Sequence, residues 1–349
     1  MKTSTLKTDR QTDRQTDRQI SIFGINPKRI AWIDVTKGVA ILLVIIGHTV
    51  KFGGATRNII FSFHMPLFFI LSGYTFRLAD DFPAFVQRVK KLVRHLIYPS
   101  LIVSVIGIFA RWLLQDQHTV SALWMITKRM GDALWWASGV GVHAHPGLGA
   151  LWFLFSLFWA KVFMDGIHLL FPGKKTGYIF VGVGLFGMAL GLKGKWLPQN
   201  MDVTFMAMLF IYVGMLWRSY ADWLERYEQL CFMAAVIIWM ICLNAPMYIE
   251  MATRSYPWTI CSVIEAVCGS YAVCCLCKAL VANARVRYVF QFIGMHTLLI
   301  FLIHHLDWIA GAVWQSSSAG MASVLRILVV LSVSFLIYVM GCFYRRKIA

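Results

Sequence analysis

Ten runs of predominantly apolar residues constrain the fold of this chain more than any other feature. A membrane-spanning helix needs about 20 apolar residues to cross ~30 Å of hydrocarbon. The runs lie at residues 30–50, 57–77, 92–114, 148–171, 177–192, 200–217, 230–249, 257–280, 286–309 and 320–341. The sequence therefore predicts an all-α fold, a polytopic membrane helix bundle with about ten transmembrane helices.

The composition supports a membrane protein and excludes other classes. Hydrophobic residues make up 59% of the 349 positions and charged residues 14%, against roughly 25% charged residues in soluble domains. A soluble enzyme and a largely disordered chain are both excluded. The net charge of +17 would suit nucleic acid, but basic cytoplasmic loops give the same balance. We therefore expect a lipid bilayer, and no nucleic acid, as partner.

The distribution of Lys and Arg predicts the orientation. Most basic residues outside the spans fall on the side of the N-terminus, so both termini are expected to be cytoplasmic. Residues 118–147 are interpreted as an interfacial amphipathic helix and loop. We expect an integral, multi-pass protein located in a bacterial inner membrane.

Two regions differ in composition. Residues 1–28 contain three copies of Thr-Asp-Arg-Gln and predict a disordered polar tail rather than a signal peptide. Residues 29–349 form the predicted transmembrane domain. The eight cysteines are expected to be buried apolar thiols, and no metal site is predicted.

Ionisable residues in the first span indicate a functional site, because each costs free energy in lipid. Asp34, Lys37 and His48 lie on one helical face, and the last two are eleven residues, or about 16 Å, apart along the axis. Gly38 and Gly47 lie close to this polar stripe and would let another helix or a ligand approach. Alternatively, Asp34 and Lys37 only neutralise each other near the inner interface.

The second span adds a second histidine. His64 comes two residues before Pro66, which is expected to kink the helix and open room for a ligand.

These motifs carry a family resemblance. The segment Arg29–Thr49, followed by Phe63–Phe69 and Ser72–Tyr74, resembles the integral-membrane acyltransferase family 3 and, within it, the sugar O-acetylase branch of fucose 4-O-acetylase-like proteins. Later landmarks resemble the family in the same order, in the stretches Leu151–Leu154, Leu197–Asp202, Tyr212–Gly214 and Ile293–His304. The resemblance extends from about residue 29 to the C-terminus.

The resemblance implies an O-acyltransferase. Such proteins move an acyl group, usually acetyl from acetyl-CoA, to a hydroxyl of a cell-envelope or exported polysaccharide or of its lipid-linked precursor. The expected partners are therefore a carbohydrate acceptor, an acyl-CoA co-substrate and the polysaccharide assembly machinery. No permanently bound cofactor is expected.

The expected catalytic residues are His48, Lys37 and Asp34. His48 would act as the general base or be transiently acylated itself. Lys37 stands where the family commonly has Arg, which keeps the charge but loses the bidentate fork. The predicted substrate-binding residues are His64, Ser72, Tyr74, His304 and Glu265, and the predicted donor-phosphate-binding cluster is Arg88, Lys90, Lys91 and Arg94.

Two other function classes use the same residue types. A multi-spanning transporter could use His, Asp and Lys as a proton relay, although no internal repeat of the kind found in transporters is visible. A non-catalytic module that binds lipid or a partner protein is the third alternative. The acceptor sugar, the modified position and the size of the acyl group stay open.

Overall fold

The computed structural model describes most of the apolar part of the chain. The described residues are 29–50, 53–114, 130–131, 134–137, 149–173, 175–245 and 248–348. Within them the fold is all-α, with one isolated bridge between Glu250 and Ser255, as predicted. The predicted tail at 1–28 lies outside the described residues, and so does most of the predicted interfacial segment.

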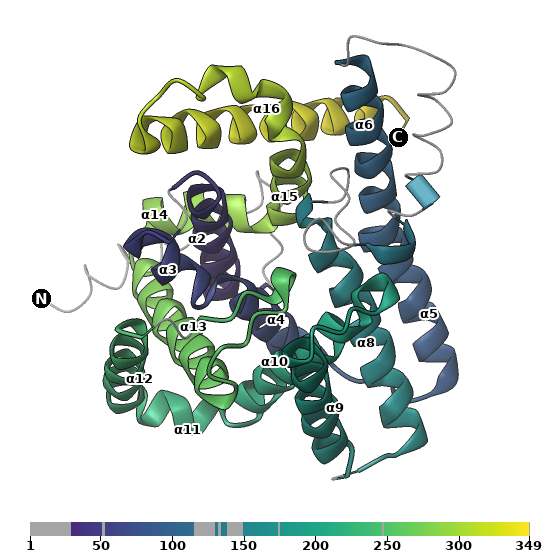
Figure 1. Cartoon of the computed structure of the whole chain (residues 1–349), viewed down its shortest axis with the longest axis vertical. Helices are drawn as coiled ribbons and strands as arrows, with labels where there is room; N and C mark the ends of the chain where they lie inside the picture. Colours follow the sequence, from purple (N-terminus) through teal and green to yellow (C-terminus); the bar gives the residue numbers. More distant parts are fainter. Residues whose placement is uncertain are drawn as a thin grey trace, which may run out of the picture.

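The helices follow the apolar runs (Figure 1). They are α2 (Ala31–Gly47), α3 (Ala55–Phe61), α4 (His64–Thr75), α5 (Phe82–Leu92), α6 (Tyr98–Leu113), α8 (Trp152–Leu170), α9 (Lys175–Leu192), α10 (Met201–Ser219), α11 (Ala221–Arg226), α12 (Glu228–Leu243), α13 (Ile260–Leu280), α14 (Ala284–Met295), α15 (Thr297–Leu306) and α16 (Ala319–Ile348). Short helical turns connect or extend them at η1 (Val93–Ile97), η2 (Gly149–Leu151), η3 (Pro198–Asn200), η4 (Met251–Thr253) and η5 (Asp307–Val313).

All ten predicted runs are helical, but fewer are long and straight enough to span a membrane. Among the described residues seven helices are long and apolar enough, and an eighth span results if α14 and the segment Thr297–Val313 count as one, across a 64° bend. Helices α2 and α12 have 17 and 16 residues. The run at 286–309 is broken because α14 ends at Met295 and α15 starts at Thr297.

Close backbone contacts at glycines fix how the central helices pack. A Cβ at Gly38 of α2 would collide with the backbone carbonyl of Phe290 in α14, and one at Gly294 would collide with that of Asp34. The two helices therefore cross in direct backbone contact, as the glycine at position 38 predicts. Gly214 of α10 meets α4 in the same way.

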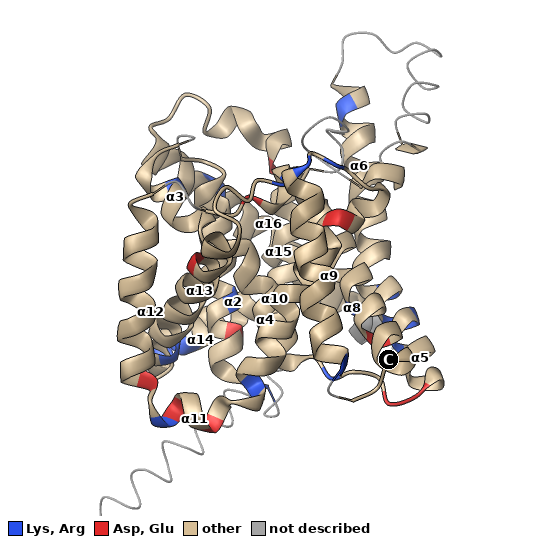
Figure 2. Cartoon of the chain, turned by 60° about the horizontal axis from the view of Figure 1, so that its bottom comes forward, with Lys and Arg blue, Asp and Glu red and all other residues tan. Residues whose placement is uncertain are grey.

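The bundle has two chemically different ends. Basic and acidic residues gather around α5, α11 and α14 at one end, while α3 lies at the other (Figure 2). Helix α16 lies along the edge of the bundle in Figure 1, and only 11% of its most apolar stretch is buried. Most of its surface is left for lipid.

Candidate active site

A cavity of about 700 Å³ lies at the end of the bundle that carries α3. Its walls come from α2, α3, α4, α6, α8, α15 and α16, from the turns η2 and η5, and from the loop that carries η4. Its described lining contains nine histidine, arginine and carboxylate side chains. They are His48, Arg57, His64, Arg111, Glu250, His304, His305, Asp307 and Arg326. Aromatic walls are supplied by Phe61, Trp152, Tyr248, Phe301 and Trp308.

His48 follows the last residue of α2 and faces this cavity. Protein surrounds His48, but the residue is accessible to solvent because it lines the cavity. No hydrogen bond reaches the imidazole from the described part of the chain. The ring lies 5.4 Å from that of His304 and 5.8 Å from that of Phe61, between centroids. An imidazole in this position is free to accept a proton from a ligand.

Two arginines hold the backbone beside His48. Arg57 donates to the carbonyl oxygen of Gly47 (2.8 Å), and Arg326 donates to that of His48 (3.1 Å). Carbonyls at the C-terminal end of a helix have no partner within the helix. The two guanidinium groups thus satisfy the end of α2 and fix where His48 projects.

His304 is oriented by a carboxylate. Its Nδ1 lies 2.7 Å from Oδ2 of Asp307, and Asp307 also accepts two hydrogen bonds from Arg326, at 2.6 and 2.8 Å. His304 and Asp307 are buried. Because an ionised carboxylate only accepts hydrogen bonds, His304 donates from Nδ1 and keeps Nε2 as its basic nitrogen.

His64 also lines the cavity. The span is interrupted near it, as expected, but Pro66 is not at the interruption. The break in this span falls at Ser62–Phe63, and α4 starts at His64, so Pro66 lies in the first turn of α4. A first-turn proline removes no helical hydrogen bond. His64 contacts the carbonyl oxygen of Ile60 through Nδ1 (3.0 Å), which bridges the break.

The other predicted substrate-binding residues do not line this cavity. Tyr74 packs its ring against Trp32 and Trp217, with centroids 5.2 and 6.1 Å away. Ser72 lies in the same part of α4. Glu265 is buried in α13, with Oε2 unpaired. Their roles in substrate binding stay predictions.

The remaining first-span residues lie far from His48. Asp34 forms a two-point ion pair with Arg29, at 2.6 and 2.7 Å, so its hydrogen-bonded partner is Arg29 and not the expected Lys37. Lys37 is half-buried, about 16 Å along the helix from His48. The structure does not bring the three predicted catalytic residues together.

The predicted donor-phosphate cluster lies at the opposite end, on α5 and η1 (Figure 2). Arg88 binds both carboxylate oxygens of Asp165 in α8 at 2.7 Å. Asp165 also accepts a hydrogen bond from the backbone amide of Ala79. Arg88 therefore joins two helices. The other three members, Lys90, Lys91 and Arg94, are exposed.

Six histidine, arginine and carboxylate residues of the cavity were not among the predicted site residues: Arg57, Arg111, Glu250, His305, Asp307 and Arg326. Arg57 lies near Glu250, Arg111 stacks on Trp308 and Arg326 reaches the backbone of His48, and sequence spacing cannot show contacts between residues so far apart in the chain. Arg326 carried one usable signal, because it is a charge inside a predicted span.

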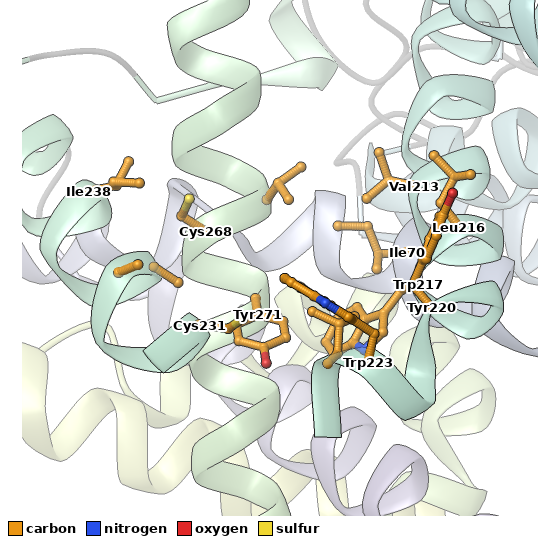
Figure 3. Close-up of a pocket in the computed structure, with 14 residues that line it drawn as sticks. Ile70, Val213, Leu216, Trp217, Tyr220, Trp223, Cys231, Ile238, Cys268 and Tyr271 are labelled. Carbon is orange, nitrogen blue, oxygen red and sulfur yellow. The ribbon is translucent and has the colours of Figure 1, made fainter. Parts of the chain in front are cut away.

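A second cavity, of about 670 Å³, has a different chemistry. It lies between α4, α10, α11, α12 and α13, and Figure 3 shows its apolar lining, with Trp217, Trp223 and Tyr271 around it. Its described lining contains no histidine, carboxylate, lysine or arginine. It offers no base for acyl transfer.

A membrane helix bundle with a histidine-lined cavity thus combines the architecture and the groups that an intramembrane transferase needs. The sequence profile of acyltransferase family 3, described as an acyltransferase domain, matches residues 30–344. The chain belongs to acyltransferase family 3 and is a membrane acyltransferase, which confirms the family resemblance. No curated protein and no solved structure gives a significant match. The narrower fucose 4-O-acetylase-like branch stays a prediction.

Proposed function

We propose that this protein transfers an acyl group, in the simplest case acetyl, from acyl-CoA to a hydroxyl of a cell-envelope or exported polysaccharide or of its lipid-linked precursor. The observation that supports this most is the free imidazole of His48 beside the ordered His304–Asp307–Arg326 group, in a cavity of about 700 Å³. Cavities of this size hold a sugar-sized ligand.

The proposed chemistry uses the two histidines differently. His48 takes the proton of the acceptor hydroxyl while the oxygen attacks the thioester carbonyl carbon, so that a C–O bond forms and the C–S bond breaks. The proton then passes from His48 to the departing thiolate. Nε2 of neutral His304 accepts a hydrogen bond from the acceptor and positions it.

The route of the acyl group has two versions. Basic residues gather at the end opposite the cavity, where we expect cytoplasmic acyl-CoA. Either the acyl-bearing arm of the donor reaches His48 through the bundle, or His48 is acylated and passes the group on. Acid quenching during turnover, followed by mass spectrometry of the peptide containing His48, distinguishes them.

Replacing His48 by Ala tests the proposal. We expect ester-linked acyl on the surface glycan to fall about 10²–10⁴-fold, with normal protein abundance in the membrane. His95→Ala is the matched control, because His95 is exposed at the opposite end. Mass spectrometry of the glycan and immunoblotting of the membrane give the two readouts. Unchanged acylation in the His48 variant would refute the mechanism.

A further inference from the structure

Arg111 is a cavity residue to which the proposed reaction gives no role. It lies in the last turn of α6. One turn earlier, Gly107 lets α6 approach Leu306 at the end of α15, because a Cβ there would lie only 3.2 Å from the leucine side chain. This close packing brings the Arg111 guanidinium over the ring of Trp308, 4.2 Å from its centroid.

Among the described residues the guanidinium of Arg111 has no anionic partner, unlike those of the other cavity arginines. Arg326 is paired with Asp307 at 2.6 Å, and Arg57 lies 3.6 Å from Glu250. Within the described residues no carboxylate pairs with Arg111. Its Nε is buried and has no hydrogen-bond acceptor, which is costly for a charged donor.

The lining therefore carries one positive charge in excess. Three arginines face two carboxylates in the described lining, and each carboxylate already pairs with one of the other two arginines. Stacking on Trp308 holds the guanidinium plane while its N–H edges stay available. A planar fork of donors fits a carboxylate or a phosphate in two-point contact.

We propose that Arg111 and Trp308 form a subsite for an oxyanion of the acceptor, so that the enzyme selects a negatively charged glycan. The inference rests on the proposed function, since it assumes that the acceptor enters this cavity. The oxyanion can be the carboxylate of an acidic sugar or the phosphate of a lipid-linked one. The ring of Trp308 provides an apolar surface beside the charge.

Equilibrium binding tests the subsite without requiring turnover. Full-length protein purified in detergent is titrated with glucuronate, glucose 1-phosphate and glucose by isothermal titration calorimetry. We expect one or both anionic probes to bind about tenfold or more tightly than glucose, and Arg111→Met to remove that preference. Arg226→Met is the control for net charge, because Arg226 is exposed on α11 at the opposite end.

Each outcome has a defined meaning. A preference for glucuronate that depends on Arg111 supports the subsite with a carboxylate ligand, and one for glucose 1-phosphate supports it with a phosphate. Equal binding of all three probes, or an unchanged preference in Arg111→Met, overturns it. If that variant does not fold, Arg111→Lys replaces it: weaker anion binding supports the subsite, and unchanged binding overturns it.

The same titration separates this inference from the proposed function. His48→Ala leaves the Arg111 guanidinium in place, so anion binding should persist in that variant. Anion binding that depends on Arg111 in a protein that transfers no acyl group would leave the subsite standing and refute the acyl-transfer proposal. Acyl transfer by a protein that shows no preference for anions would support the proposed function and overturn the subsite.

Discussion

The imidazole rings of His48 and His304 lie 5.4 Å apart at the wall of one cavity, although His48 follows α2 and His304 lies in α15. Their surroundings differ. His304 is tied to Asp307, while His48 has no side-chain hydrogen bond within the described residues. This asymmetry supports the proposed division of roles, in which His304 orients the acceptor and His48 transfers the proton.

Asp307→Asn tests the orienting role. The amide removes the charge that fixes the His304 tautomer, and positioned acid–base groups contribute about 10²–10⁴-fold, so we expect acyl transfer to fall at least about tenfold. The rate of CoA release from acetyl-CoA, measured across pH, should also change in profile, which a purely structural loss would not cause. Asp222→Asn, on exposed α11, is the control. A variant with wild-type rate and profile would contradict the assignment.

Arg326→Met should destabilise the protein strongly. Asp307 is 2% exposed and would lose its two guanidinium hydrogen bonds, and breaking a buried pair costs about 3–5 kcal/mol. Thermal unfolding in detergent measures the loss. The double variant Asp307→Leu/Arg326→Met should recover most of the stability, because it leaves neither member of the ion pair buried without its partner. It should not recover activity, because His304 still lacks its carboxylate. A stable single variant would show that the pair contributes little.

Gly38→Ala should disrupt the packing of α2 on α14. The added methyl would collide with the backbone carbonyl of Phe290, which no side-chain rotation can relieve. We expect a large drop in the melting temperature or loss of folded protein. Gly182→Ala in α9 is the matched control, because nothing lies within 4 Å of its Cβ position, and alanine favours a helix. Equal melting temperatures of the two variants would argue against direct backbone contact.

Arg254→Met should release the loop that carries Glu250 over the cavity. Arg254 is buried, binds Asp202 at 2.6 Å and Asn200 at 2.6 Å, and stacks on Trp196. We expect faster limited proteolysis within this loop and a KM that rises more than kcat falls, because the cavity wall loses its anchor. Arg218→Met, outside the cavity, is the comparison. An unchanged cleavage rate would show that other contacts hold the loop.

Glu250 gives a pH dependence of stability. Burial raises the pKa of Glu250, and the nearby Arg57 guanidinium offsets only part of the rise. The folded protein therefore binds this proton more readily than the unfolded chain, and the associated stability is present at low pH and lost as pH rises through the folded pKa. Glu250→Gln does not titrate, so its melting temperature should rise relative to that of the wild type as pH increases above about 4.3, the ordinary pKa of a glutamate. A constant difference would contradict the raised pKa.

The sequence predicted the fold better than the site. Apolar run length depends only on local composition, so the helices appeared where expected, and shortfalls arose where a run is bent, as at His296. His48, His64 and His304 were all selected and all line the cavity. Ser72, Tyr74 and Glu265 were selected too and lie elsewhere, because polarity within a span does not show which space a side chain faces.

The cavity residues that were not predicted were missed for one physical reason. Nothing in the local sequence around Arg57 or Glu250 distinguishes them from other loop charges, whereas Arg326 is a charge inside an apolar run. Their place in the site depends on long-range contacts, such as that of Arg326 with the carbonyl oxygen of His48, which joins α16 to the end of α2. Asp34 likewise found Arg29, just outside its helix, instead of Lys37 on its own face.

The counter-ion of Asp307 comes from α16, the final helix of the chain. A nascent polypeptide therefore lacks the guanidinium partner of Asp307 until α16 has left the ribosome and inserted. Chains truncated before residue 326 should therefore be recognised as defective by membrane quality control.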